Sequence, residues 1–372
     1  MDRVCGLDVH KDSVFMCILT EKGEKIEEVF GTLTPELDRL RDLLVLHNVG
    51  KVAMESTSIY WMPLWRILEC DFDVKLVNPY FIRQLPGRKT DVKDAHWIAT
   101  VLQKELIKDS YVPDSIIQQL RQYNRRMFNL NKSKQRAQVG IDLTLQRCNI
   151  RLSNYVSDIG GRSMQKVVKA LTDGETDSDK LLLLVHKRVR NKHSDQTIKD
   201  SLTGIVSPAD LDMLRMCREE VELYERQLAE CKQKMTDICT EHFAEELEIL
   251  QTAPGIKQHS AMSIIAEIGV DMKTFLTASA LVGWAGLRPR NDQSAGKIKG
   301  RKTLHGNKYL RVILIQCAWG ASRTRSERFH LRYNALKKRM NHNKALVGNA
   351  RKLLVVIWNM LAKKQSYKPM AA

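Results

Sequence analysis

Several features that would point to a secreted or membrane protein are missing from this 372-residue sequence. No stretch approaches the roughly 20 uninterrupted apolar residues that a membrane helix needs. The N-terminus, MDRVCGLDVHKDS, mixes acids and bases into its first apolar run and does not resemble a secretory signal. The eight cysteines form no Cys-x-x-Cys pair, so we expect neither a disulfide framework nor a structural zinc site. We therefore expect a cytoplasmic protein with reduced thiols and no membrane partner.

Acidic residues are scarce in the last quarter of the chain. From Arg288 to Ala372 there are 21 Lys and Arg residues and only two acids, whereas residues 1–287 carry a net charge of −2. A second basic segment, Ile116–Arg151, has eight Lys and Arg residues against one acid. Such asymmetry favours a nucleic-acid partner, with a merely solvated basic face as the alternative.

The pattern of apolar residues changes near residue 110. Before it, short β-rich runs alternate with helical patterns, which predicts a mixed α/β domain. After it nearly all patterns are helical. The expected strands are two within 3–20, one at 51–54 and one at 74–77, and the expected helices are 34–47, with Thr34 as the N-cap, 60–68 and 90–106. We expect three domains, at 1–115, 116–245 and 246–372.

The helical part contains two long helices. Residues 116–150 form a polar, basic helix that Gly140 interrupts, and Ser207-Pro208 opens a second helix. In the second, apolar residues alternate at spacings of three and four from Leu214 to Ile238. This pattern predicts a coiled coil or a long hairpin arm, or else a helix packed within one subunit. Shorter helices are expected within 157–206 and at 247–252, 261–268, 309–323, 329–339 and 345–363.

Four carboxylates of the first domain form a candidate metal site. Asp8 lies inside an apolar strand, where a charge is costly unless it binds something. Glu55 ends another strand, and Asp91 and Asp94 are three residues apart on one helix face. Oxygen ligands without His or Cys favour Mg²⁺ or Mn²⁺. Taken singly, each acid also has a structural interpretation, such as a helix N-terminal charge for Asp91.

Three segments around these acids resemble a known family. GLDVHKDS (6–13), AMESTSIYW (53–61) and GRKTDVKDAHWIA (87–99) resemble the RuvC-like, RNase H-like domain of the DEDD insertion-sequence transposases. That is the IS110 family, including its IS1111 branch. The family's acidic tetrad falls on Asp8, Glu55, Asp91 and Asp94.

Two motifs of the last domain extend the resemblance. The Pro-Gly-Ile turn in QTAPGIKQHSAMSIIAEIG (251–269) resembles a helix-hairpin-helix element, which holds phosphate through backbone N–H groups. An ordinary helical hairpin is the alternative. Chemistry alone gives Ser294 no role beyond that of a loop serine, because no His base is adjacent. The family pattern Pro-x4-Ser-x-Gly, followed by a basic Gly-Asn-x-x-Leu-Arg stretch, falls on Pro289, Ser294, Gly296, Gly306, Asn307, Leu310 and Arg311.

The resemblance implies that Ser294 is the DNA nucleophile of a recombinase and completes the metal site of another subunit. It implies donor and target DNA, a structured bridge RNA and a homo-oligomer, dimeric or tetrameric, in a prokaryotic cytoplasm near the nucleoid. The alternatives are a hydrolytic nuclease or Holliday-junction resolvase without a covalent intermediate, and a non-enzymatic nucleic-acid-binding protein. The expected nucleic-acid contacts are Arg125, Arg126, Lys132, Lys134, Arg136, Gly255, Lys257, Arg288, Arg290, Lys297, Lys299, Arg301, Lys302, Asn307 and Arg311.

Overall fold

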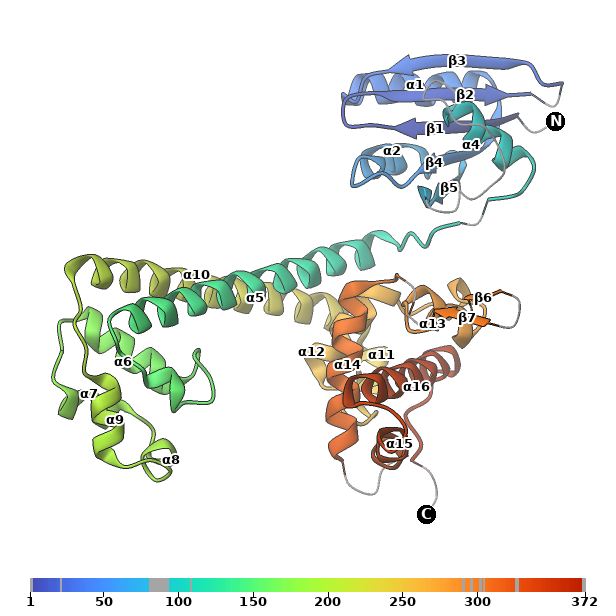
Figure 1. The fold of residues 1–372 in the computed structure, drawn as a ribbon. Coiled ribbons are helices and arrows are strands. Elements are labelled where there is room, and N and C mark those ends of the chain that lie inside the picture. Colours follow the sequence, from blue (N-terminus) through green and yellow to red (C-terminus); the bar gives the residue numbers. More distant parts are fainter. Residues whose placement is uncertain are drawn as a thin grey trace. The chain divides into compact units, whose positions relative to one another are not determined.

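The computed structural model divides the chain into two compact units, Met1–Val112 (unit 1) and Pro113–Ala372 (unit 2). It describes residues 3–20, 22–79, 94–107, 109–289, 292–294, 297–300, 303, 305–324 and 328–369, with backbone only at 292–294 and 297–300. Unit 1 is a mixed sheet with helices, and unit 2 is mostly helical (Figure 1). This agrees with the expected change from α/β to helical structure near residue 110.

Unit 1 is built on a five-stranded sheet in the order β3-β2-β1-β4-β5. The first three strands are antiparallel neighbours, and β1, β4 and β5 are parallel. Parallel pairs need a crossover, which the helices between them supply. The elements are β1 (Arg3–Val9), β2 (Val14–Leu19), β3 (Lys25–Phe30), α1 (Thr34–Leu46), β4 (Val49–Glu55), α2 (Trp61–Leu68), β5 (Asp73–Val77) and α4 (Asp94–Gln103).

A close backbone contact sets α4 against the sheet. A Cβ added at Gly6 in β1 would lie 2.2 Å from the Ala95 carbonyl oxygen and 2.3 Å from the Ala99 nitrogen. The helix therefore approaches β1 more closely than any side chain at position 6 would permit. The same face buries Val4, Cys17, Leu19, Ala53, Val77, Ile98 and Leu102, whereas α1 and α2 belong to the core of the opposite face.

Two predictions for unit 1 need correction. Strand β3 was not predicted, because most of its residues are exposed at the sheet edge and an edge strand shows little apolar alternation. Thr34 is not the N-cap of α1: the cap is Leu33, which makes no side-chain hydrogen bond, and Pro35 lies in the first turn. The remaining described strands and helices lie where their patterns predicted them.

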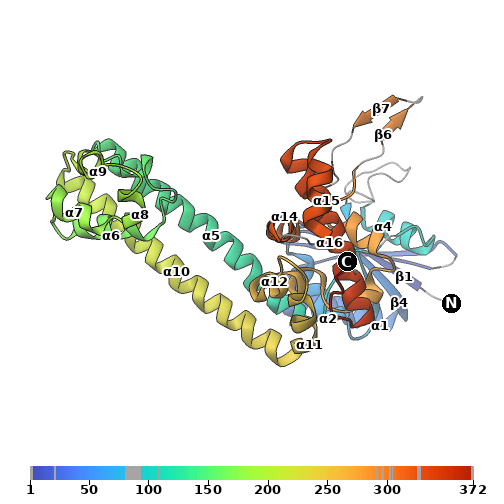
Figure 2. The same ribbon diagram turned by 90° about the horizontal axis from the view of Figure 1, so that it is seen from below.

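Unit 2 begins with an arm of two long antiparallel helices, α5 (Ser115–Arg147) and α10 (Pro208–His242). Figure 2 shows them side by side. Contacts between Lys134 and Glu225 and between Arg147 and Asp210 pair residues in opposite order along the two helices. Helix α5 continues through Gly140, so the expected interruption there is wrong. Because Cys217 Sγ lies 3.2 Å from a Cβ added at Gly140, the glycine lets α10 approach closely.

Shorter helices complete unit 2. Four follow α5 and pack at one end of the arm, in the segment that the sequence predicted as short helices: α6 (Arg162–Thr172), α7 (Ser178–Leu184), α8 (Lys187–Arg190) and α9 (Asp195–Leu202). The C-terminal part contains α11 (Ala244–Gln251), α12 (Gln258–Ile268), α13 (Ala278–Trp284), the hairpin of β6 (Asp292–Ser294) and β7 (Lys297–Gly300), α14 (Lys308–Arg323), α15 (Arg328–Lys337) and α16 (His342–Lys363).

A buried carboxylate joins the arm to this C-terminal part. Glu267 of α12 is fully buried. Its Oε1 accepts hydrogen bonds from Asn124 Nδ2 (3.0 Å) and Arg125 Nε (3.3 Å), and its Oε2 accepts from Arg125 Nη2 (3.1 Å) and Asn307 Nδ2 (2.6 Å). Arg121 also donates to the backbone carbonyls of residues 266 and 267. One carboxylate therefore connects α5, α12 and the start of α14.

Helix α16 is long and apolar enough to cross a membrane by length and composition. Half of its most apolar window is buried inside the protein, where it packs against α13, α14 and α15. A core helix passes the same test, so α16 is weak evidence for a membrane span.

Replacement of Gly6 by Ala is expected to destabilise unit 1 by about 1–3 kcal/mol, because backbone atoms of α4 cannot move away cheaply. The measurement is thermal or denaturant unfolding of the full chain. Gly50→Ala in β4 is the matched control, since nothing lies within 4 Å of its added Cβ. Equal effects of the two substitutions would contradict the close contact.

Replacement of Glu267 by Ala is expected to destabilise unit 2 by about 3–5 kcal/mol, because it leaves two amides and two partly buried guanidinium groups without their acceptor. Glu267→Gln keeps one acceptor oxygen and should cost less. Glu248→Ala, at an exposed position of α11, should change the free energy of unfolding by no more than about 0.5 kcal/mol. A loss at Glu267 as small as that at Glu248 would contradict the network.

Candidate functional site

Asp8 and Glu55 are buried carboxylates on one face of the unit 1 sheet. Asp8 follows Gly6 by two residues in β1, and Glu55 follows Ala53 by two in β4. Side chains alternate along a strand, so both acids point to the face that α4 covers. Gly6 and Ala53 are register partners, which puts the acids at equivalent places near the carboxyl ends of neighbouring parallel strands. Their exposed fractions are 5% and 7%.

Asp94 is the first residue of α4, so it belongs to the helix that lies over this sheet face. Asp91 lies outside the described residues. Among the residues that the structure does describe, no three Asp, Glu, His or Cys side chains form a ready metal cluster. The donor chemistry of the acids nevertheless fits a hard cation, because they offer carboxylate oxygens and buried like charges repel unless a cation separates them. The tetrad remains a prediction.

His10 is a neighbour of Asp8 that the sequence did not single out. Its Nε2 lies 3.3 Å from Asp8 Oδ2, and its ring meets Phe15 edge-on. The residue lies in the GLDVHKDS segment, but it follows the end of β1, and strand spacing does not predict where its side chain turns. His10 is therefore a further candidate for this site.

Ser294 is the last residue of β6, in a two-stranded hairpin where it is the register partner of Lys297. An antiparallel bridge between Pro289 and Thr303 closes the base of this hairpin. Arg311 holds that base, because its Nη1 donates to Thr303 Oγ1 at 2.9 Å and to the Gly286 carbonyl at 3.4 Å. Ser294 thus lies in a hairpin whose base is hydrogen-bonded to Arg311 of α14.

The Gly-Asn-x-x-Leu-Arg motif fixes the backbone at the base of the hairpin. A Cβ at Gly306 would lie 2.3 Å from the Gly286 nitrogen, so this glycine lets two backbone segments touch. Asn307 Oδ1 caps α14 by accepting from the N–H groups of Tyr309 and Leu310, while its amide donates to Glu267. Leu310 is fully buried. Nucleic-acid contacts by Asn307 and Arg311 remain predictions, and both side chains have these protein partners.

The Pro-Gly-Ile turn joins α11 to α12. Gly255 has φ +81°, and a Cβ there would lie 2.2 Å from the Cys317 carbonyl oxygen of α14. The glycine is thus required for the turn and for its packing on α14. Lys257, the N-cap residue of α12, is exposed.

The other predicted nucleic-acid contacts fall into three groups. Those of α5 lie along the arm, where Arg125 binds Glu267, Arg126 donates to Gln227, Lys134 pairs with Glu225, and Lys132 lies over the Phe128 ring. Arg136 and Arg288 are exposed. The structure describes only the backbone of Lys297 and Lys299, and Arg290, Arg301 and Lys302 lie outside the described residues.

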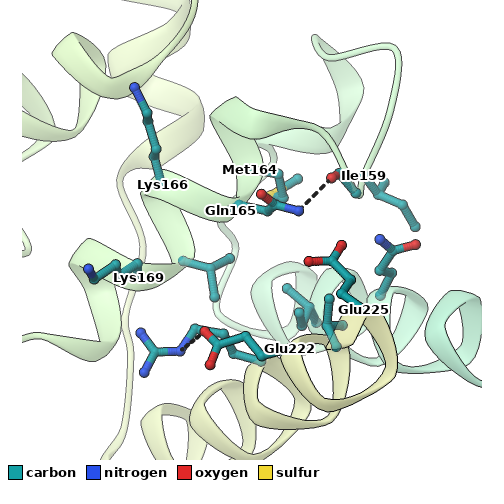
Figure 3. A pocket seen from close by; sticks show the side chains of 13 residues that line it. Ile159, Met164, Gln165, Lys166, Lys169, Glu222 and Glu225 are labelled. Atoms are coloured by element: carbon teal, nitrogen blue, oxygen red, sulfur yellow. Dashed lines mark hydrogen bonds and ion pairs between the residues drawn. The ribbon is translucent and has the colours of Figure 1, made fainter. Parts of the chain in front are cut away.

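A cavity of about 270 Å³ lies between α5, α6 and α10 (Figure 3). Its wall combines apolar side chains such as Met164 with charged ones such as Lys169 and Glu222. Arg218, which also lines it, pairs with Glu222. It contains no residue of the predicted site, and we assign no chemistry to it.

Both ends of the chain are similar to known transposases. Residues 5–150 match the IS110-type DEDD transposase model, and residues 247–334 match the transposase model of the IS116/IS110/IS902 family. The chain is also similar to the transposase for insertion sequence element IS1111A of Coxiella burnetii (strain RSA 493 / Nine Mile phase I), with 30% identity over 128 residues.

That similarity spans 33% of this chain and 35% of the relative, so about a third of each protein is compared. The two family matches cover the segments that contain the acids of unit 1 and the serine hairpin of unit 2. The two ends of the chain are therefore similar to two transposase domains of the IS110 family.

Proposed function

We propose that this protein is a transposase that cuts and rejoins DNA, with a RuvC-like metal site in unit 1 and Ser294 as the nucleophile. The observation that carries the proposal is the pair of buried carboxylates, Asp8 and Glu55, at adjacent strand ends on the face that α4 covers. The sheet order β3-β2-β1-β4-β5 supports an RNase H-like fold for this unit.

The acids of unit 1 would hold one or two Mg²⁺ or Mn²⁺ ions. Asp8 and Glu55 provide fixed oxygens, and Asp94 and Asp91 provide oxygens from α4 and the segment before it. The bound cation would stabilise negative charge on the phosphate and on the departing oxygen. His10, next to Asp8, would restrain the orientation of that carboxylate.

Ser294 would carry the covalent step. Its Oγ attacks a DNA phosphorus, so that the Oγ–P bond forms and the bond from phosphorus to one deoxyribose oxygen breaks. The hydroxyl proton goes to solvent or a nearby base, and the departing oxygen takes up a proton. The energy of the broken bond stays in the phosphoserine link, and a hydroxyl of the second duplex reverses the step without a nucleotide cofactor.

Replacement of Ser294 by Ala is expected to abolish covalent protein–DNA adducts and to lower strand exchange by about 10⁴-fold or more. The assay uses labelled DNA carrying the insertion-sequence ends and denaturing gels of the trapped complex. Ser279→Ala, at an exposed position of α13, is the control and should behave as wild type. Adducts that persist in Ser294→Ala would contradict the assignment of Ser294 as the nucleophile. Metal-dependent cutting by the wild type without any adduct would favour the hydrolytic nuclease.

We also propose a structured bridge RNA that pairs with donor and target DNA, a dimeric or tetrameric assembly, and a place in the prokaryotic cytoplasm. Two basic regions, in α5 and in the C-terminal helices, suit two polyanionic ligands.

Purification of the full chain from its host is expected to yield one dominant structured RNA. The measurement is sequencing of co-purified RNA with and without high-salt washing. Recovery of only abundant cellular RNAs, in proportion to their concentrations in the cell, would contradict the proposed bridge RNA.

A further inference from the structure

The outer face of α14 carries an exposed aromatic side chain. Trp319 is 46% exposed, although tryptophan usually buries most of its ring. The inner face of the helix packs into the core through Leu310, Leu314, Ala318 and Ala321, which are fully buried. The outward positions, at spacings of three and four, are Lys308, Val312, Gln316, Trp319 and Arg323.

Arg323 is stacked on this ring. Its guanidinium carbon lies 4.0 Å from the Trp319 ring centroid, one helical turn further along. No acidic side chain among the described residues forms an ion pair with Arg323. The pair is thus a flat cationic and aromatic surface whose charge the described protein does not neutralise.

The backbone beneath the pair is held firmly. The Pro-Gly-Ile turn packs against this part of α14: a Cβ at Gly320 would lie 3.4 Å from Gly255 Cα, and one at Gly255 would touch the Cys317 carbonyl. At the end of the helix, the Ser322 carbonyl oxygen lies 2.6 Å from His330 Nδ1 of α15. Because this turn of α14 is packed against its neighbours, the Trp319 ring loses little conformational entropy when a ligand stacks on it.

The surroundings are basic. Exposed Lys257 follows the turn that packs on Gly320, and exposed Arg328 and Arg332 lie on α15, whose His330 contacts the end of α14. Burial lowers the pKa of Lys352 in α16, and the charges of these two arginines lower it further. Among the described residues none of these cations forms an ion pair with an acid, which suits an anion that arrives from outside.

We propose that Trp319 and Arg323 form a stacking platform for a base of unpaired nucleic acid, with the strand's phosphates on the surrounding Lys and Arg side chains. The ligand class follows from the surface, because a duplex hides its base faces whereas a single strand offers both a π-face and phosphates. The proposal rests on the function proposed above only in requiring a nucleic-acid partner, and it does not involve the cutting step.

The test is binding of fluorescent 20-nucleotide single strands, in DNA and RNA versions, and of the blunt duplex, measured by anisotropy with the full chain. Trp319→Ala is expected to weaken single-strand binding by about 5- to 150-fold, the usual range for loss of one stacked base, and to leave the duplex nearly unchanged. Trp319→Phe should retain most of the affinity. Arg323→Ala should also weaken single-strand binding, and Lys257→Ala, at one of the surrounding cations, should reduce the salt slope of log K by about one.

Leu331→Ala, at an exposed apolar position of α15, is the matched control and should bind as wild type. Photocrosslinking with 5-iodouracil in the strand should label the tryptic peptide that contains Trp319. Equal loss of duplex and single-strand binding, unchanged binding, or a changed oligomeric state with normal binding would each overturn the platform. Because strand exchange by Ser294→Ala is a separate assay, failure of one proposal is distinguishable from failure of the other.

Discussion

The carboxylate of Glu267 is the constraint on which unit 2 depends. A fully buried charge is tolerated only where its oxygens are well paired, and here two amides and the guanidinium groups of Arg121 and Arg125 pair it. Those donors come from α5 and from the cap of α14, so desolvation of one side chain fixes the spacing of three helices. Asn307 then joins two tasks, since it caps α14 and donates to Glu267. Arg311 of α14 is hydrogen-bonded at the base of the hairpin that contains Ser294, so the position of α14 also affects that hairpin.

In unit 1 a close backbone contact, instead of a buried charge, fixes the packing of a helix. The absence of a side chain at Gly6 lets α4 lie directly on β1. Because Gly6 and Asp8 share a sheet face, the helix that begins at Asp94 covers the face with both buried acids. The glycine therefore belongs to the candidate site as much as the acids do, although it offers no ligand atom.

Sequence patterns predicted most elements because apolar residues recur at helical spacing, as in α10, or form a continuous buried run, as in β1. They missed β3, whose exposed edge position removes the alternation, and they placed an interruption at Gly140, where a close helix contact explains the residue. The sequence placed Asp8 in one strand and Glu55 at the end of another, but their position on one face follows from the pairing of β1 with β4, which the sequence does not show. The protein partners of Asn307 and Arg311 could not be predicted. An asparagine or arginine that binds protein is the same residue type as one that binds phosphate.

We propose that the acids of unit 1 and the serine of unit 2 serve one reaction. The most direct measurement is the amount of serine–DNA adduct formed by wild type and by Asp8→Asn during a titration with Mg²⁺, with DNA binding measured in parallel. The account predicts that wild-type adduct rises with Mg²⁺ and is lost in a chelator, and that Asp8→Asn binds DNA but forms no adduct at any concentration. Equal adduct in both proteins, with or without the metal, would contradict it.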